Sequence, residues 1–253
     1  PIVRYATIAA EVDGRKESLP DVVAGIHRFL VGLFKKVCIA NVAGELVARY
    51  MDADPTTLST GESWFGLLMF SLQIYYDFSG YSDMAIGLGQ MFGFHYLENF
   101  RHPYIAKTAT EFWRRWHISL GTFFRDYVYI PLGGNRSHPY RNLFIVWGLT
   151  GLWHGASWNF ILWGLYFGGL ILLERVALRD LLDRLHPSVA HGYLLVAAYF
   201  GWALFYFTDM GALGAYLDVM FGANSGLETA GELQVVMEEH LYWLILALVG
   251  CAP

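Results

Sequence analysis

The chain has 253 residues, of which 55% are hydrophobic and 15% are charged, and its formal net charge is −5. Soluble domains carry about 25% charged residues, so this deficit indicates a membrane protein with the lipid bilayer as its main partner. All seventeen Lys and Arg residues lie at or before Arg184, whereas six acids and no base follow from Asp209 onward. The absence of a basic stripe argues against a nucleic-acid-binding surface.

The two cysteines and the chain ends indicate how the protein is organised. Cys38 and Cys251 each lie in an apolar setting far apart in sequence, and we expect buried free thiols there. No secretory signal opens the chain, and the apolar run 241–253 is too short to cross a bilayer. We therefore expect one membrane domain (1–253, core motifs 64–175) that is truncated at both ends and comes from a larger protein.

The first long apolar segment carries three bases. Residues 22–51 follow a helical pattern that Arg28, Lys35 and Lys36 interrupt. One interpretation is a tilted or amphipathic helix whose lysines reach toward the cytoplasmic face. The alternative is that the two lysines attract the phosphates of a cofactor. The polar stretch 52–62 that follows is expected to be a loop.

A second apolar tract covers residues 64–94, where only Asp77 and Asp83 are charged. Its centre reads YYDFSGYSDMAIG, and its small and polar residues predict a break or kink at membrane depth. An Asp at that depth costs about 2.5–3.5 kcal/mol, so each carboxylate should pair or face water. Each could equally hold two helices together or serve a function.

Residues 98–141 contain seven bases against three acids, which places them on the cytoplasmic side by the positive-inside rule. A Trp- and Arg-rich helix is predicted over 110–124. Pro131, Gly133 and Gly134 then predict a turn.

The third apolar tract, 143–173, has His154 as its only side chain that can carry a charge near neutral pH. One helix of this length would be about 46 Å long, too long for a hydrocarbon core of about 30 Å without strong tilt. Gly151 and Gly155 flank His154, so we expect a bend or a re-entrant hairpin there. Bases at both ends of the tract favour a re-entrant pair over a single crossing.

The last third of the chain contains one short span. Three arginines between 175 and 184 mark a cytoplasmic loop, and 192–208 is a seventeen-residue apolar span. The base-free acidic stretch 209–239 is then a loop on the outer side.

His117 and His154 differ from the other seven histidines because they lie in apolar, Trp-rich surroundings. Burial favours the neutral imidazole, which is the form that a general base needs. The alternative for His154 is a structural core histidine. Neither residue has a second ligand three or four positions away, so we expect no metal site.

Three long motifs, YYDFSGYSDMAIG, EFWRRWHISLGTFFRDYVYIPLGGNR and GLWHGASWNFILWGLYFG, together resemble the membrane-bound O-acyltransferase (MBOAT) family. Within it they are similar to the bacterial alginate O-acetyltransferase membrane subunits, closely up to about residue 175. The resemblance implies an all-α polytopic membrane helical bundle, with re-entrant or tilted helices around an intramembrane tunnel. It also implies a multi-pass protein of the bacterial cytoplasmic (inner) membrane.

The resemblance also implies roles for single residues. The family's catalytic histidine matches His154, and a second polar position, a histidine in this branch, matches His117. The Asp of the YSDMAIG stretch matches Asp83, and Asp77 is a further supporting candidate. Acyl transfer from a thioester to a hydroxyl needs a base and charge relief at the carbonyl oxygen. We expect His154 to act as the base or to orient the thioester, and His117 to position the donor or assist proton movement.

Four other residues are candidates for supporting roles. Asn159 could donate a hydrogen bond to an oxyanion or cap a bend. Arg114, Arg115 and Arg125 could contact donor phosphates, although lipid headgroups are the commoner partners of such residues.

The expected function is transfer of an acetyl group, from acetyl-coenzyme A as donor and with no tightly bound cofactor, for O-acetylation of an exported polysaccharide. In this branch, proteins hand the acetyl group to a separate periplasmic acetyltransferase, so either that enzyme or the polysaccharide is the expected partner. The alternatives are D-alanyl transfer to teichoic acid from a carrier protein, a proton-coupled transporter, and a purely structural subunit.

Overall fold

A computed structural model of the chain describes residues 2–222 and 230–252, and the secondary structure within them is helical without strands. The predicted all-α class is therefore confirmed. Two helical segments among the described residues are long and apolar enough to cross a membrane, Trp158–Arg184 and Pro187–Tyr206.

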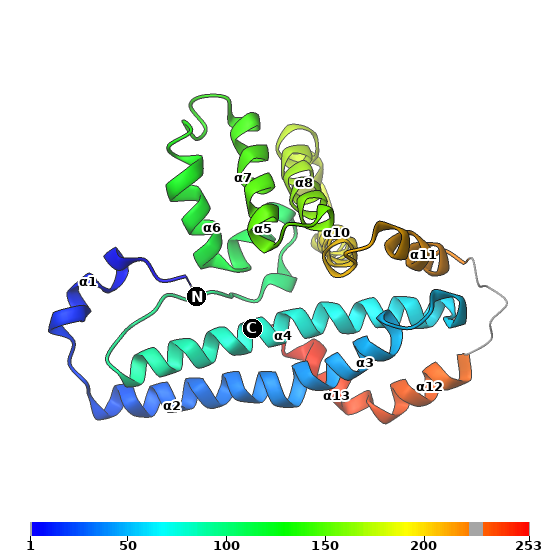
Figure 1. Cartoon of the computed structure of the whole chain (residues 1–253), viewed down its shortest axis with the longest axis horizontal. Coiled ribbons are helices and arrows are strands. Elements are labelled where there is room, and N and C mark those ends of the chain that lie inside the picture. Colours follow the sequence, from blue (N-terminus) through cyan, green and yellow to red (C-terminus); the bar gives the residue numbers. More distant parts are fainter. Residues whose placement is uncertain (1, 223–229, 253) are drawn as a thin grey trace.

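Two long antiparallel helical rods form the base of the molecule (Figure 1). After α1 (Tyr5–Gly14), the first rod consists of α2 (Leu19–Phe34), a π-helical segment (Lys35–Ala40) and α3 (Asn41–Met51). The second rod is α4 (Thr60–Met91). Its N-terminus is closed by a reciprocal capping box, so the helix begins inside the stretch that was predicted to be a loop.

The predicted break within 64–94 is wrong, because α4 runs through this tract without interruption. Its glycines permit close packing against α2. A Cβ on Gly25 would lie 2.6 Å from the carbonyl oxygen of Gly87, and a Cβ on Gly32 would lie 2.5 Å from that of Gly80. The glycines therefore let two backbones touch, as small residues do between membrane helices, and they do not interrupt the helix.

Both aspartates of α4 are paired, as the cost of an unpaired carboxylate predicted. Asp83 accepts hydrogen bonds from Arg28 at 2.6 Å and from Lys35 at 2.7 Å. Asp77 forms an ion pair with Lys36 at 2.5 Å. The bases of the first rod thus neutralise the acids of the second.

A second group of helices stands above this base (Figure 1). It starts with α5 (Ala109–Arg115), α6 (Ile118–Phe124) and a π-helical segment, Arg125–Tyr129. The antiparallel helices α7 (Pro139–His154) and α8 (Trp158–Leu173) follow. The predicted turn between α6 and α7 is confirmed, and two of its glycines adopt positive φ angles.

The single helix predicted over 110–124 is wrong, because the chain breaks between α5 and α6. His117 adopts a left-handed backbone conformation, with φ 45° and ψ 52°. The N–H of Ile118 donates to the carbonyl oxygen of Asn99 at 3.0 Å instead of to a helical partner. A tertiary hydrogen bond thus replaces a local one, and sequence periodicity does not report such an exchange.

The predicted bend beside His154 is confirmed. Residues 155–157 turn the chain so that α7 and α8 pack side by side (Figure 1). A Cβ on Gly164 would lie 2.3 Å from the carbonyl oxygen of Trp147, so the two helices are in backbone contact. The packing of α7 against α8 therefore determines where His154, at the end of α7, lies relative to α8.

The last part of the chain leads from the upper group back to the base, where its final helices lie (Figure 1). The stretch 209–239, predicted to be a loop, contains two helices among its described residues; residues 223–229 lie outside the described part. Its location on the outer side stays a prediction. Asp209 caps the first of them by accepting the N–H of Ala212 at 2.7 Å. The elements of this region are a π-helical segment (Glu174–Leu178), α9 (Arg179–Arg184), α10 (Pro187–Tyr206), α11 (Met210–Met220), α12 (Ala230–Glu239) and α13 (Leu241–Val249).

Helix α13 packs against the base through two hydrogen bonds to main-chain oxygens. Tyr76 donates to the carbonyl oxygen of Ala247 at 2.6 Å, and Trp243 donates to that of Cys38 at 2.8 Å. Both cysteines are free thiols, as predicted. The prediction of burial is wrong for Cys38, which is exposed, while Cys251 is partly buried.

A buried glutamate joins the upper helices. The Glu174 carboxylate, 5% exposed, accepts hydrogen bonds from the backbone N–H groups of Ala109 at 2.5 Å and Thr110 at 3.0 Å. These groups open α5, so the negative charge also meets the positive end of the helix dipole. The hydroxyl of Tyr193 in α10 donates to the same carboxylate at 3.2 Å.

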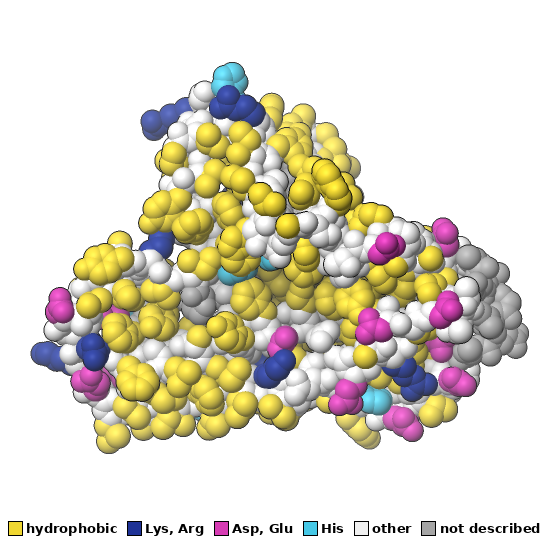
Figure 2. Space-filling view, viewed as in Figure 1, with side chains coloured by type: hydrophobic (Ala, Val, Ile, Leu, Met, Phe, Trp, Pro, Cys, Tyr) yellow, Lys and Arg dark blue, Asp and Glu magenta, His cyan; other side chains and the backbone are white. Residues whose placement is uncertain are grey.

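Hydrophobic side chains cover much of the outer surface (Figure 2). On α2, Leu19, Val23, Leu30 and Val37 (the last in the π-helical segment that continues it) form an exposed apolar stripe with exposures of 51–76%. A stripe of this size is unusual for a soluble monomer and typical of a surface that meets lipid or another protein.

Candidate active site

A cavity of about 570 Å³ lies where the base and the upper helices meet. Residues of α4, α5, α6, α7, α8 and α10 contribute to its wall. Aromatic side chains dominate the lining, and four polar side chains interrupt it: Lys36, Asp77, His117 and His154.

His154 is positioned by aromatic packing. It is the last residue of α7, and extended backbone at Gly155 ends the helix there. Its ring centroid lies 4.9 Å from that of Trp153, 5.0 Å from that of Trp163 and 5.2 Å from that of Phe205. None of the described residues forms a hydrogen bond with the ring. Both imidazole nitrogens therefore remain available to a substrate.

His117 is positioned by both packing and hydrogen bonding, and it is only 5% exposed. Its ring meets Phe78 edge to face at 4.6 Å, and its Nδ1 lies 3.2 Å from the Oδ1 of Asn99. The ring of Trp153 is 6.0 Å from His117 and also contacts His154. One indole thus contacts both histidines within the cavity wall.

The ion pair between Lys36 and Asp77 forms the polar rim of the cavity. The two side chains are 42% and 46% exposed, whereas the histidines lie deeper. Tyr81, which is 60% exposed, lies beside them in the lining. The cavity therefore has a charged, open side and an apolar, aromatic interior.

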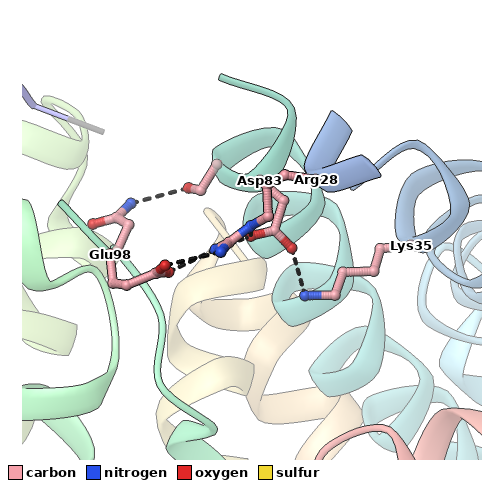
Figure 3. A network of polar contacts seen from close by, with 6 residues as sticks. Arg28, Lys35, Asp83 and Glu98 are labelled. Carbon is pink, nitrogen blue, oxygen red and sulfur yellow. Dashed lines mark hydrogen bonds and ion pairs between the residues drawn. The ribbon is translucent and has the colours of Figure 1, made fainter. Parts of the chain in front are cut away.

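Asp83, unlike Asp77, does not line the cavity. It belongs to an ion network with Arg28, Lys35 and Glu98 (Figure 3). The Arg28 guanidinium lies between the two carboxylates, with contacts of 2.6 Å to each. The structure thus separates the two aspartates that the sequence motif placed together, and gives Asp83 a structural environment.

Asn159 lies outside the cavity lining and is fully buried. Its amide donates to the carbonyl oxygens of Leu204 at 3.4 Å and Phe205 at 3.3 Å, near the C-terminal end of α10. These bonds join the start of α8 to the helix that supplies Phe205 to the cavity wall.

The predicted arginines lie at the surface on the side of α5 and α6. Arg114 is exposed, while Arg115 pairs with Glu111 at 2.8 Å. Arg125 lines a separate cavity of about 230 Å³. This second cavity shares His117 and three neighbouring side chains of α5 and α6 with the first one.

Residues 1–209 match the family model described as MBOAT, membrane-bound O-acyltransferase family. The chain belongs to this family. Members of the MBOAT family are membrane-bound, in agreement with the apolar composition and with the two helical segments that are long enough to span a bilayer.

Several curated relatives of this MBOAT chain are known. It is 43% identical over 209 residues to the "Probable alginate O-acetylase AlgI" of Azotobacter vinelandii, covering 81% of this chain and 41% of the relative. It is 41% identical over 181 residues to a peptidoglycan O-acetyltransferase of Helicobacter pylori, with 69% and 34% covered. It is 29% identical over 187 residues to a teichoic acid D-alanyltransferase of Bacillus subtilis, with 68% and 46% covered. The chain spans less than half the length of these relatives.

Sequence reasoning on the MBOAT chain missed Asn99, which contacts His117, and its neighbour Glu98, which belongs to the ion network around Arg28. They lie in a loop after α4, and no spacing rule links Asn99 to His117, eighteen positions later. The one available signal is local: two adjacent polar residues lie in the short segment between a long apolar helix and the Trp- and Arg-rich region.

Proposed function

We propose that the chain holds the active site of a membrane O-acyltransferase that acetylates an exported polysaccharide. The donor is a cytoplasmic thioester, acetyl-coenzyme A, and the acetyl group moves across or within the membrane. This proposal rests on the convergence of His117, at the break between α5 and α6, and His154, at the end of α7, on one aromatic cavity. The alginate O-acetylase and peptidoglycan O-acetyltransferase relatives support an acetyl group as cargo.

The chemistry needs one base and one polarised carbonyl. His154 accepts the proton of the attacking hydroxyl, whose oxygen forms a C–O bond to the acetyl carbon. The C–S bond of the thioester breaks, and the thiolate takes up the proton that His154 received. His117 holds the donor near its carbonyl group. The aromatic walls exclude water, so hydrolysis does not compete with transfer.

The membrane organisation is also part of the proposal. We infer a polytopic bundle in the bacterial cytoplasmic membrane with a tunnel between its two sides. The two cavities that meet at His117 support such a passage, with Arg125 near the donor end and Lys36 and Asp77 near the other. The acetyl group then passes to the polysaccharide or to a periplasmic transferase. Arg114, Arg115 and Asn159 support the site from outside the cavity.

One alternative rests on a specific observation. The teichoic acid D-alanyltransferase relative supports D-alanyl transfer from the thioester of a carrier protein. The same base and cavity serve that reaction, because it also joins an acyl carbon to a hydroxyl oxygen. The donor decides between the two functions.

The test measures transfer of radiolabelled acetyl groups from acetyl-coenzyme A in native membranes. His154→Ala should lower the rate by about 10²- to 10⁴-fold, the usual contribution of general acid–base catalysis. His117→Ala should also lower the rate, because the donor is then no longer held near its carbonyl group. His27→Ala, an exposed histidine of α2, is the matched control and should keep the wild-type rate. His154→Gln, which keeps a polar side chain of similar size, distinguishes lost chemistry from lost folding.

Each outcome is informative. Full acetyl transfer by His154→Ala at matched protein levels would exclude the mechanism. If the wild-type protein transfers D-alanine from a loaded carrier protein and no acetyl group, the acetylation proposal is wrong and the alternative holds.

A further inference from the structure

Asn99 links two helices that carry the site. Its side chain is completely buried, and its amide group donates to the Oγ of Ser82 in α4 at 3.1 Å. Its Oδ1 accepts the backbone N–H of Ser119 in α6 at 3.1 Å. Its main-chain oxygen accepts the N–H of Ile118, the bond that holds the break between α5 and α6. Asn99 thus determines the backbone on which His117 lies.

The contacts of Asn99 also determine where His117 carries its proton. A backbone N–H can only donate, so the amide atom that meets Ser119 N must be the oxygen. The same oxygen accepts the hydroxyl hydrogen of Ser119 at 2.8 Å and lies 3.2 Å from His117 Nδ1. The Ser119 hydroxyl oxygen also lies 3.4 Å from Nδ1, but its hydrogen is directed to Asn99. Both oxygens beside Nδ1 therefore act as acceptors, which requires a hydrogen on that nitrogen. In the neutral ring, Nε2 is then left with a lone pair. None of the described residues donates a hydrogen bond to Nε2.

We infer that Asn99 is a positioning residue that locks His117 in the Nδ1-protonated tautomer, so that Nε2 is the ring atom that accepts a proton or a hydrogen bond in the cavity. The functional part of this inference rests on the proposed acyl transfer, whereas the tautomer itself does not. His117 then has a defined tautomer, and Asn99 acts on the reaction through His117 without contacting the substrate.

The ion network holds Asn99 in place. Glu98, its neighbour, receives two hydrogen bonds from Arg28, with Nη1–Oε1 at 2.9 Å and Nη2–Oε2 at 2.6 Å (Figure 3). Arg28 also binds Asp83, the neighbour of Ser82. Two neighbouring residues of the loop are thus linked to two neighbouring residues of α4. Glu98 is linked to Asp83 through Arg28, and Asn99 is hydrogen-bonded directly to Ser82.

An amide suits this position better than a carboxylate for a neutral histidine. Asn99 accepts the Nδ1 hydrogen without a negative charge, so it stabilises the imidazolium form less than a carboxylate would. An aspartate in the same place would add a charge within hydrogen-bond distance, which favours protonation of imidazole by about 1–3 pH units. The choice of amide thus keeps the base form of His117 available at neutral pH.

The experiment compares Asn99→Asp and Asn99→Ala in the acetyl-transfer assay over a range of pH. Asn99→Asp keeps the acceptor, so it should retain activity while the limb that reports neutral imidazole moves about 1–3 units toward alkaline pH. Asn99→Ala should lose about 10-fold or more at every pH, because His117 in the other tautomer has no lone pair on Nε2 with which to accept a hydrogen bond in the cavity.

Asn142 provides the matched control. It is equally buried, and its amide donates to the carbonyl oxygens of Leu132, Gly134 and Ser137, away from both histidines. Asn142→Asp should change stability and leave the pH profile in place. An equal alkaline shift in Asn142→Asp, or no shift in Asn99→Asp, would overturn the positioning role.

A second measurement separates this inference from the proposed function. Nitrogen NMR of protein labelled with ¹⁵N-histidine, with His117→Gln to assign the signal, reports which ring nitrogen carries hydrogen. A proton on Nδ1 of His117 supports the inference even in a protein that transfers no acetyl group. A proton on Nε2 alone contradicts it.

Discussion

His154 and His117 are held by different kinds of force, and this difference has consequences for catalysis. Aromatic rings surround His154 without directing a hydrogen bond at it, so its ring can reorient as a substrate arrives. His117 is fixed at Nδ1 by Asn99. In such a site, the fixed His117 can hold the donor while the His154 ring reorients to accept the proton.

The ion pair between His95 and Glu11 gives the contact between α1 and the end of α4 a pH dependence. The hydrogen bond to Glu11 raises the pKa of His95, and the hydrogen bond from the backbone N–H of His95 lowers the pKa of Glu11. The stabilisation that protonated His95 gives to this contact is complete below the ordinary histidine pKa of 6.5. It is lost as the pH rises through the raised pKa of His95. The stabilisation that the Glu11 carboxylate gives is lost as the pH falls through the lowered pKa of Glu11.

We therefore expect the backbone amides of α1 to exchange hydrogen faster near pH 8.5 than near pH 5.5, after correction for intrinsic rates, since about one proton leaves His95 in between. Hydrogen-exchange mass spectrometry of residues 5–14 measures this directly. In His95→Gln the difference should disappear, and its persistence would show that another group is responsible.

At the residue level, the sequence predicted the site in part. Both histidines and Asp77 line the cavity, because an ionisable group in an apolar tract is retained only where it can be used or paired. Asp83 was indistinguishable from Asp77 by composition, yet it pairs with Arg28, fifty-five positions away. Asn99 was missed because its partners are brought together only by the fold.

At the level of elements, helix packing depends on glycine positions that periodicity analysis interprets as breaks. Gly25 and Gly32 on α2 face Gly87 and Gly80 on α4, at the same seven-residue spacing. Two helices can approach to backbone contact only where both lack side chains. The sequence therefore predicted helical structure in these two apolar segments, but not that α4 is continuous. Glycine within an apolar segment is compatible with a helix break and also with close helix packing.

Substitution of one of these glycines should loosen the base. A Cβ on Gly32 would lie 2.5 Å from the carbonyl oxygen of Gly80 and 2.7 Å from the N of Met84, so the helices must move apart. We expect Gly32→Ala to destabilise the protein by about 1–3 kcal/mol, the usual range for overpacking. The midpoint of thermal unfolding in detergent measures the effect.

Gly169 in α8 provides the comparison, because no atom lies within 4 Å of a Cβ placed there. Gly169→Ala should be neutral or stabilise by up to about 1 kcal/mol, since alanine favours a helix. Equal loss of stability in both variants would mean that helix contact at Gly32 is looser than the structure indicates.

On the scale of the whole molecule, the site depends on the relative placement of two helical groups. The base contributes Asp77 and Phe78, and the upper group contributes both histidines. Glu174 joins α5 to the end of α8 and to α10, while α10 and α11 pack on α4. A change in the angle between the groups would alter the cavity without unfolding any helix.

The tryptophans of the cavity lining should allow ligand binding to be followed by intrinsic fluorescence. Five of the nine tryptophans line it: Trp113, Trp116, Trp153, Trp163 and Trp202. Indole emission responds to the polarity around the ring, so entry of a thioester donor should change the intensity or wavelength of the intrinsic fluorescence. Titration of the purified protein with acetyl-coenzyme A measures this change.

Trp153→Phe should reduce the signal, because this indole contacts both histidines and is 53% exposed. Trp64→Phe should preserve it, because Trp64 stacks on Tyr199 away from the cavity lining. A response carried by Trp64 would place the donor elsewhere. Occupancy of the site can thus be followed without a label or a coupled reaction, in variants whose catalysis has been removed.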